Sequence, residues 1–249
     1  MIKFLQSLFK GESVQEESFS ALGVDMHSHI LPGIDDGSDS LERSLELVQA
    51  MKDMGYRKLI MTPHVMNDFY RNTPGIIREK LQLLRKAVAE AGIEMELDCA
   101  AEYYLDEGFL QMLEDGDELL TFGDNYLLFE TSFLNEPLNL RETIFKMRAR
   151  GFKPVLAHPE RYTYFYGKFE SLAELWQQGV LFQPNLNSLA GYYSPGAREM
   201  AEKLVDNGMV DFLGSDAHSL KHTNFLQQKV LQSKYLPKAL ALSVRNNQL

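Results

Sequence analysis

The sequence predicts a single-domain α/β barrel, because apolar runs typical of strands alternate with helical patterns about seven times along 249 residues. Most of these strands begin shortly after a glycine that ends the preceding helical pattern, an order that gives a parallel sheet. Six of the strands stop at a histidine or an acidic residue. An open doubly wound sheet is the alternative, but it would place ligands mainly at one switch point rather than at six strand ends.

Each predicted strand leads into a side chain that could bind a metal ion. In chain order the strands are 23–26 before His27 and His29, 59–62 before His64, 96–101 before Glu102, 126–129 before Glu130, 155–157 before His158, and 210–215 before Asp216 and His218. The C-terminal ends of barrel strands meet at one face, where the active site lies. We therefore expect these side chains to lie together.

Helical patterns occupy the intervals between the strands. They cover residues 41–54, 76–88, 140–150, 172–178 and 197–207, and a glycine follows each of them. Residues 21–235 contain no repeat, low-complexity tract or linker, so we assign one domain to residues 21–249. An N-terminal extension, residues 1–20, precedes it, and for so short a segment packing or disorder is favoured over contact with a membrane.

Composition excludes several classes of protein. A formal net charge of -10 argues against a nucleic-acid duplex as partner, since phosphate backbones are bound by clustered Lys and Arg. No apolar stretch approaches the roughly 20 residues that span a bilayer. The N-terminus lacks the features of a signal peptide, so we expect a cytoplasmic protein without stable membrane insertion. Cys99 is the single cysteine, and no phosphate-binding loop ending in arginine follows it, which excludes a cysteine-based tyrosine phosphatase.

The spacing of His27 and His29 gives the clearest geometric expectation. Residues two apart on a strand point to the same side, so both imidazoles can share one metal ion. One such pair is weak evidence by itself. Its recurrence with acidic and histidine residues at five further strand ends is what predicts a metal site.

The segment 25–37, Asp-Met-His-Ser-His-Ile-Leu-Pro-Gly-Ile-Asp-Asp-Gly, resembles the opening motif of the polymerase-and-histidinol-phosphatase (PHP) superfamily. More narrowly, the chain resembles the bacterial metal-dependent protein-tyrosine phosphatases of capsule and exopolysaccharide synthesis. The likeness covers about residues 22–222 and includes the motifs at 62–64, 101–104, 129–130, 157–161 and 215–218. This family has a distorted barrel with fewer than eight strands, which agrees with a (β/α)7 arrangement.

The resemblance implies three divalent metal ions, with manganese favoured and iron or zinc as alternatives. His27, His29, Glu102 and Asp216 would hold the first ion, Glu102, Glu130 and His158 the second, and Asp36, His64 and His218 the third. Three divalent cations would outweigh these four carboxylates and attract an anionic substrate. The adjacent Asp35 is expected to be a turn residue or to support a ligand, because neighbouring acids in an extended segment cannot face the same ion.

The implied reaction is hydrolysis of phosphotyrosine by water that the metal ions activate, without a protein nucleophile. A phenol with a pKa of roughly 10 leaves more readily than a serine alkoxide. Asp36, Asp216 and His218 are candidate proton donors, and Arg161 matches a family arginine that would clamp the phosphate. The implied partner is a tyrosine-phosphorylated protein, namely a membrane-associated bacterial tyrosine autokinase that controls polysaccharide export.

Two further expectations concern the walls of the site. Tyr70 and Tyr164 follow strands at the catalytic face and are candidates to stack on a phosphotyrosine ring. His222 stands where relatives carry an arginine, and we expect it to be exposed to solvent. The alternatives to a tyrosine phosphatase are a phosphoesterase acting on a small monoester such as histidinol phosphate or on nucleic-acid ends, and a non-catalytic metal-binding protein.

Overall fold

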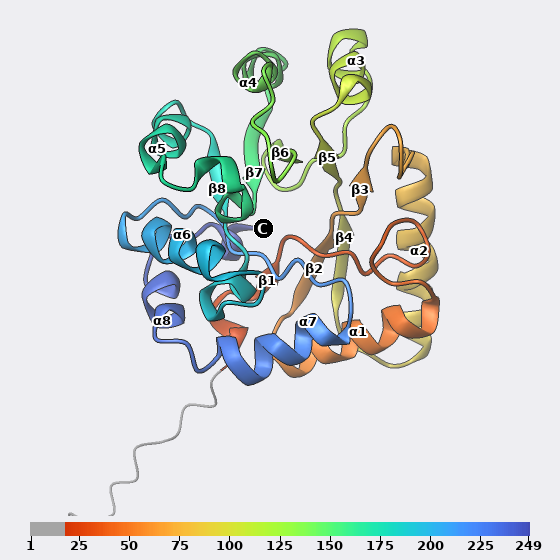
Figure 1. Cartoon of the computed structure of the whole chain (residues 1–249). Helices are drawn as coiled ribbons and strands as arrows, with labels where there is room; N and C mark the ends of the chain where they lie inside the picture. Colours follow the sequence, from red (N-terminus) through yellow and green to blue (C-terminus); the bar gives the residue numbers. More distant parts are fainter. Residues whose placement is uncertain (1–17) are drawn as a thin grey trace, which may run out of the picture.

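The computed structural model describes residues 18–249, and its strands form a parallel barrel (Figure 1). One sheet has the strand order β1-β2-β4, and the other has the order β3-β5-β6-β7-β8. The strands are β1 (Val24–Asp25), β2 (Lys58–Met61), β3 (His64–Val65), β4 (Glu96–Cys99), β5 (Glu102–Tyr104), β6 (Tyr126–Glu130), β7 (Lys153–Ala157) and β8 (Leu181–Gln183). All pairs are parallel, as the sequence predicted.

Two strand positions of the barrel are each divided into two short strands. β3 continues β2 after an interruption at Thr62 and Pro63, and β5 continues β4 after Ala100 and Ala101. The backbone N–H of Ala100 donates to Met61 at 2.9 Å, which carries the pairing across the break. The eight strands therefore occupy six positions around the barrel.

The seventh position is filled by the segment at 212–217, which forms no regular strand, so the predicted strand 210–215 is wrong. The segment makes only isolated parallel bridges, from Gly214 to Asn185 beyond β8 and from Ala217 to Ser28 beyond β1. The reason is that the N–H of Ser215 donates to the side chain of Asp25, at 2.8 Å, instead of to a backbone carbonyl. The bridges nevertheless close the barrel, so the (β/α)7 arrangement is confirmed.

Alternation along the strands separates two hydrophobic clusters. The smaller cluster, which includes Val24, Leu128 and Val155, contains alternate residues of the strands and fills the barrel interior. Their neighbours Leu127 and Leu156 belong to the larger cluster, which packs the helices onto the outer face. The interior cluster therefore lies within the barrel, beneath the C-terminal ends of the strands.

The helices lie around the outside of the strands (Figure 1). The α-helices are α1 (Leu41–Asp53), α2 (Pro74–Glu90), α3 (Glu107–Asp115), α4 (Leu140–Ala149), α5 (Phe169–Gln177), α6 (Pro195–Asp206), α7 (Leu220–Phe225) and α8 (Tyr235–Leu240). Short 3-10 helices cover Phe19–Ala21, Pro159–Arg161, Thr163–Phe165, Leu186–Ala190 and Asn246–Gln248, and a π-helical turn covers Leu226–Val230.

The five predicted helices are confirmed to within a few residues, and side-chain caps define the starts of three of them. The side chains of Ser40, Thr73 and Ser194 each accept from a backbone N–H three residues later, at the starts of α1, α2 and α6. The sequence analysis did not predict α3, α7 and α8, which span 9, 6 and 6 residues. So few residues give little helical periodicity to recognise.

Most of the proposed N-terminal extension, residues 1–17, lies outside the described residues. Within residues 18–249, no helix has both the length and the apolar composition that crossing a membrane requires.

Candidate metal centre

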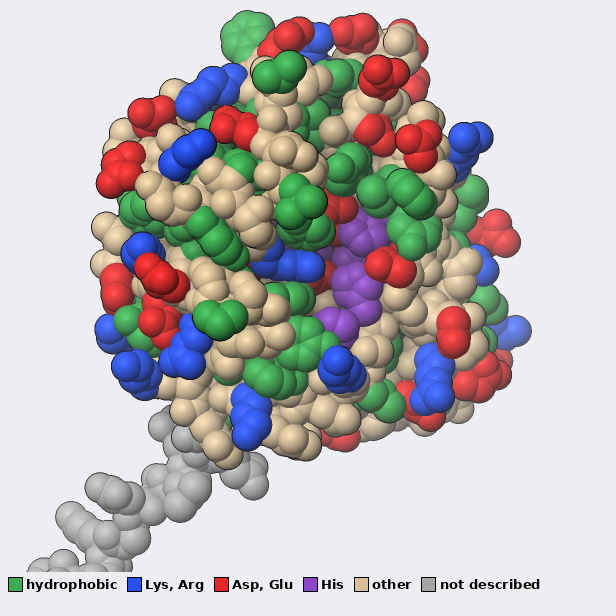
Figure 2. Space-filling view, viewed as in Figure 1, with side chains coloured by type: hydrophobic (Ala, Val, Ile, Leu, Met, Phe, Trp, Pro, Cys, Tyr) green, Lys and Arg blue, Asp and Glu red, His purple; other side chains and the backbone are tan. Residues whose placement is uncertain are grey.

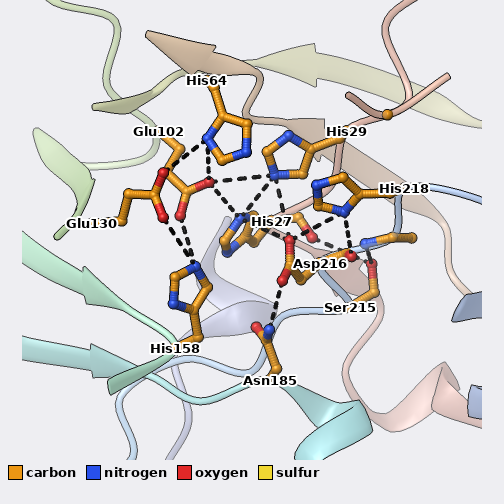
Figure 3. A network of polar contacts seen from close by, with 12 residues as sticks. His27, His29, His64, Glu102, Glu130, His158, Asn185, Ser215, Asp216 and His218 are labelled. Carbon is orange, nitrogen blue, oxygen red and sulfur yellow. Dashed lines mark hydrogen bonds and ion pairs between the residues drawn. The ribbon is translucent and has the colours of Figure 1, made fainter. Parts of the chain in front are cut away.

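Nine side chains converge at the C-terminal face of the barrel. Figure 3 labels all of them except Asp36. They are the nine that the sequence selected: His27, His29, Asp36, His64, Glu102, Glu130, His158, Asp216 and His218. Seven of them are buried, whereas Asp36 is exposed and His218 is half-buried. The barrel therefore brings together residues separated by up to 191 positions in the chain, because they lie at the ends of strands or in the loops that follow them.

The first group surrounds a single point. His27 Nε2 lies 3.2 Å from His29 Nε2, and Glu102 Oε2 lies 3.3 and 3.4 Å from these two nitrogens. Asp216 Oδ1 lies 3.5 and 3.4 Å from the same two atoms. Ligand atoms about 2.0–2.2 Å from one ion, at tetrahedral or octahedral angles, lie roughly 3 Å apart. These five separations are close to those between ligand atoms in a metal coordination shell.

Glu102 joins this group to a second one. Its other oxygen, Oε1, lies 3.0 Å from His158 Nε2, and Glu130 Oε2 lies 3.8 Å from the same nitrogen. The two oxygens of one carboxylate therefore face different groups, the arrangement of a bridging ligand. A third group forms around Asp36 Oδ1, which lies 3.4 Å from His64 Nε2 and 3.5 Å from His218 Nε2.

The ring of His64 faces more than one group. Its Nδ1 lies 3.2 Å from Glu102 Oε2 and 3.0 Å from Glu130 Oε1, so this nitrogen could serve the second ion while Nε2 faces Asp36. The division of the nine residues into three sets accordingly stays a prediction.

The side chains fit bound cations better than they fit one another. His64 Nδ1 and His158 Nδ1 are buried without a hydrogen-bond partner among the described residues. His64 Nδ1 is close to two carboxylate oxygens, but the geometry of a hydrogen bond is not met. A nitrogen aimed between carboxylate oxygens suits a shared divalent ion.

The electrostatics of the cluster also favour bound positive charge. Burial disfavours ionisation of Glu102, but the surrounding His27, His64 and His158 outweigh it and hold the pKa of this carboxyl well below its usual range. For His64, burial and the neighbouring His29 oppose protonation, yet Glu102 and Glu130 raise its pKa to about 9. The carboxylates that raise the pKa of His64 would also attract divalent cations.

Asp35 orients a histidine rather than joining the cluster, as expected. Its Oδ2 lies 2.8 Å from His29 Nδ1 and accepts from the N–H of His64, and its Oδ1 accepts from the N–H of Gly37. With Nδ1 of His29 fixed in this way, Nε2 faces the first group.

Two supporting residues were not found from the sequence. Gln183 Oε1 bonds to His27 Nδ1, and Gln183 Nε2 donates to Asn185 Oδ1 at 2.9 Å. Asn185 Nδ2 in turn donates to Asp216 Oδ2 at 2.7 Å, so a pair of buried amides connects two members of the first group. Their position at the end of β8 is the signal that could have identified them, since the other strand ends carry the cluster.

A pocket of about 760 Å³ opens above the cluster and contains Arg161. The guanidinium lies between the rings of Phe133 and Tyr193, 4.5 and 4.1 Å from their centroids, and Nη1 donates to Asp216 Oδ2 at 3.0 Å. Stacking on two rings and one charged hydrogen bond hold the side chain in place, and its other N–H groups have no hydrogen-bond partner within residues 18–249 and could bind an anion.

The two tyrosines selected from the sequence differ in position. Tyr70 lines the pocket, and its ring stacks 5.7 Å from that of His64. Tyr164 is absent from the pocket lining because its ring stacks on Tyr162 at 5.5 Å and its hydroxyl lies 2.7 Å from Thr131 Oγ1. Of the two, only Tyr70 is placed to contact a ligand.

His222 is not the exposed residue that we expected. It is half-buried and lines the pocket, with its ring 4.9 Å from that of Tyr192 and 5.4 Å from that of His218. Burial, together with repulsion from His218, lowers its pKa to about 4. The helix α7 turns this side chain back over the site, which residue type alone does not reveal.

The family model for capsular polysaccharide synthesis proteins, CpsB/CapC, matches residues 23–235. The chain belongs to this family. It is 32% identical over 209 residues to the tyrosine-protein phosphatase YwqE of Bacillus subtilis, a match that covers 84% of this chain and 82% of the relative. It is 27% identical over 233 residues to the tyrosine-protein phosphatase CpsB of Streptococcus pneumoniae, covering 90% of this chain and 96% of that protein.

Solved structures agree with the family assignment. One crystal structure comes from a study of YwqE from Bacillus subtilis and CpsB from Streptococcus pneumoniae, described there as metal-dependent tyrosine phosphatases. It superposes with a TM-score of 0.79 at 30% identity, and the match covers 88% of this chain and 89% of that chain. A lactonase from Listeria monocytogenes superposes with a TM-score of 0.54 at 14% identity, covering 93% of this chain and 92% of that chain. The second likeness shows the barrel fold alone.

Replacing Asn185 by leucine should weaken metal binding by about 10- to 100-fold, because Asp216 and Gln183 each lose a buried partner. Titration of the metal-free protein with manganese measures the effect. Asn187→Leu is the matched control, since Asn187 is equally buried and its side-chain atoms have no hydrogen-bond partner among the described residues. Equal affinities of the Asn185 variant and the wild type would contradict the supporting role.

The raised pKa of His64 predicts a pH dependence of the metal-free protein. The stabilisation from protonated His64 is fully present below its ordinary pKa of 6.5 and is lost as the pH rises through about 9. Thermal unfolding in excess chelator should therefore show that His64→Asn is less stable than wild type at pH 6 and that the difference shrinks by pH 9. A difference that is constant or grows with pH would show that His64 is not held protonated.

Proposed function

We propose that the chain is a metal-dependent protein-tyrosine phosphatase. The observation that carries the proposal is the cluster of five histidines and four carboxylates lying beneath a pocket that also holds Arg161. Membership of the CpsB/CapC family and the names of the relatives support the same activity. The nine side chains of the cluster and Arg161 all belong to the described part of this chain.

Divalent ions bound by this cluster would neutralise phosphoryl oxygens and make water nucleophilic at neutral pH. The protein residues position the substrate. Arg161 is oriented by Asp216, Phe133 and Tyr193, and its planar guanidinium is suited to a phosphate at the pocket floor. Tyr70 and Tyr104 line the same pocket and offer aromatic contacts for the ring of phosphotyrosine.

The geometry narrows the choice of proton donor. The Oδ2 atom of Asp216 is occupied by Arg161, Asn185 and Tyr193, at 3.0, 2.7 and 3.2 Å. Asp36 and His218 are less buried and line the pocket, so they are better placed to reach the leaving oxygen. Because phenolate is a good leaving group, loss of either donor should matter less for an aryl phosphate than for an alkyl phosphate.

The finer parts of the function are also proposals. We infer three ions, with manganese favoured over iron or zinc, because the family resemblance implies them, and the mixed imidazole and carboxylate set suits all three metals. The family description supports a role in capsular polysaccharide synthesis, and we propose a tyrosine-phosphorylated bacterial kinase of polysaccharide export as the natural substrate. The cytoplasmic location expected from the sequence stays a prediction.

The deciding experiment measures phosphate release from a phosphotyrosine peptide and, separately, from histidinol phosphate. Metal-stripped protein resupplied with manganese should hydrolyse the peptide, and His64→Ala should lower this activity by more than 100-fold, since the variant removes a member of the cluster. A preference for histidinol phosphate would indicate a small-monoester phosphatase. Activity on neither substrate, with metal bound, would contradict the proposed reaction.

A further inference from the structure

Exposed apolar side chains gather at the mouth of the pocket. Within residues 18–249, seven large apolar side chains are at least 36% exposed, and three of them, Phe69, Phe133 and Leu134, line this pocket. Figure 2 shows hydrophobic side chains around the hollow in which the histidines are visible. Single exposed apolar residues are ordinary, but a group that borders a functional pocket marks a binding surface.

Phe69 is held outward by a short, well-bonded turn. Met66 and Tyr70 exchange two backbone hydrogen bonds, of 2.9 and 3.1 Å, and the N–H of Asn67 donates to Asp106 at 2.8 Å. Phe69 at the tip of this turn is nevertheless 74% exposed. The ring is therefore presented to solvent by a fixed backbone, which lowers the entropy that binding would cost.

The pocket wall that follows β6 is fixed in a similar way. The hydroxyl oxygen of Ser132 accepts from the N–H groups of Leu134 and Asn135, at 3.3 and 3.4 Å. The carbonyl of Phe133 accepts from the N–H of Thr163 at 2.8 Å. Leu134 is 71% exposed above this turn, so each wall offers one prominent apolar side chain.

The pocket is larger than a phosphotyrosine side chain alone requires. Cavities of roughly 300–1,000 Å³ hold whole drug-sized ligands, and this pocket measures about 760 Å³. A phosphotyrosine side chain that reaches the cluster leaves space for its neighbours in the substrate. Asp68 is exposed next to Phe69, and together with the net charge of -10 it disfavours acidic neighbours.

We propose that Phe69 and Leu134 bind bulky apolar side chains beside the phosphotyrosine of a protein substrate, and so select segments in which apolar residues flank the phosphorylated tyrosine. The inference rests on the proposed phosphatase activity. It assigns substrate selectivity to two residues that touch neither the metal cluster nor the phosphate.

The test compares two phosphotyrosine peptides that differ only in flanking residues, leucine in one and serine in the other, with p-nitrophenyl phosphate as a substrate without flanks. The wild-type enzyme should show a kcat/KM about tenfold higher for the leucine peptide, as burial of one or two apolar side chains would give. Phe69→Ser and Leu134→Ser should each reduce this preference, and the double variant should abolish it. Hydrolysis of p-nitrophenyl phosphate should not change.

Phe145→Ser is the matched control, because Phe145 is 71% exposed on α4 and does not line the pocket. The proposal is overturned if wild type has no preference for the leucine peptide, if the preference survives in the double variant, or if Phe145→Ser abolishes it equally.

A binding measurement separates failure of this inference from failure of the proposed function. Peptides carrying a non-hydrolysable phosphonate analogue of phosphotyrosine should bind wild type more tightly with leucine flanks than with serine flanks, and the double variant should bind both equally. Wild type that hydrolyses no substrate but shows this difference in binding would refute the proposed reaction and support the apolar selectivity. Equal binding of both peptides to wild type would refute the selectivity whatever the activity.

Discussion

The arrangement of this barrel depends on one constraint, which is that buried carboxylates need positive charge beside them. Glu102 is fully buried, and its two oxygens face His27 on one side and His158 on the other. An isolated ionised carboxylate in such a place would cost several kcal/mol, so the fold can hold it only with cations or protonated imidazoles as partners. Histidines at neighbouring strand ends meet this need and also make the site suitable for divalent metals.

Placement of the cluster in turn shapes the upper part of the barrel. The position at 212–217 cannot pair regularly, since it must turn Asp216 and His218 into the site, and Asp216 has a positive φ of 51°. The side chain of Asp25 replaces the missing backbone acceptor by binding both the N–H and the hydroxyl of Ser215. Closure of the barrel and orientation of the cluster thus depend on the same few side-chain bonds.

The sequence was informative where the signal is local. Strand ends that carry His27, Glu102 or His158 could be recognised because a short apolar run stops at an ionisable residue, and five helices could be recognised because an apolar periodicity ends before a glycine. Gln183 and Asn185 could not, since an amide gains its role only from neighbours that are far away in the chain.

The aromatic residues illustrate the same limit. Tyr164 and Tyr193 are alike as residue types, but only Tyr193 reaches Arg161 and the pocket, because the intervening loops decide which ring points inward. Likewise, the half-buried position of His222 depends on the direction of α7 rather than on its own sequence neighbourhood. These positions depend on tertiary packing, which a short stretch of sequence does not determine.

The central claim is that the nine converging side chains form a metal centre in which Glu102 is shared. A crystal structure of the protein prepared with excess manganese, with anomalous scattering recorded at the manganese edge, tests this claim most directly. Three anomalous peaks are expected among these side chains, two of them on either side of the Glu102 carboxylate. Absence of peaks, with His158 Nε2 still bonded directly to Glu102 Oε1 as at 3.0 Å here, would contradict it.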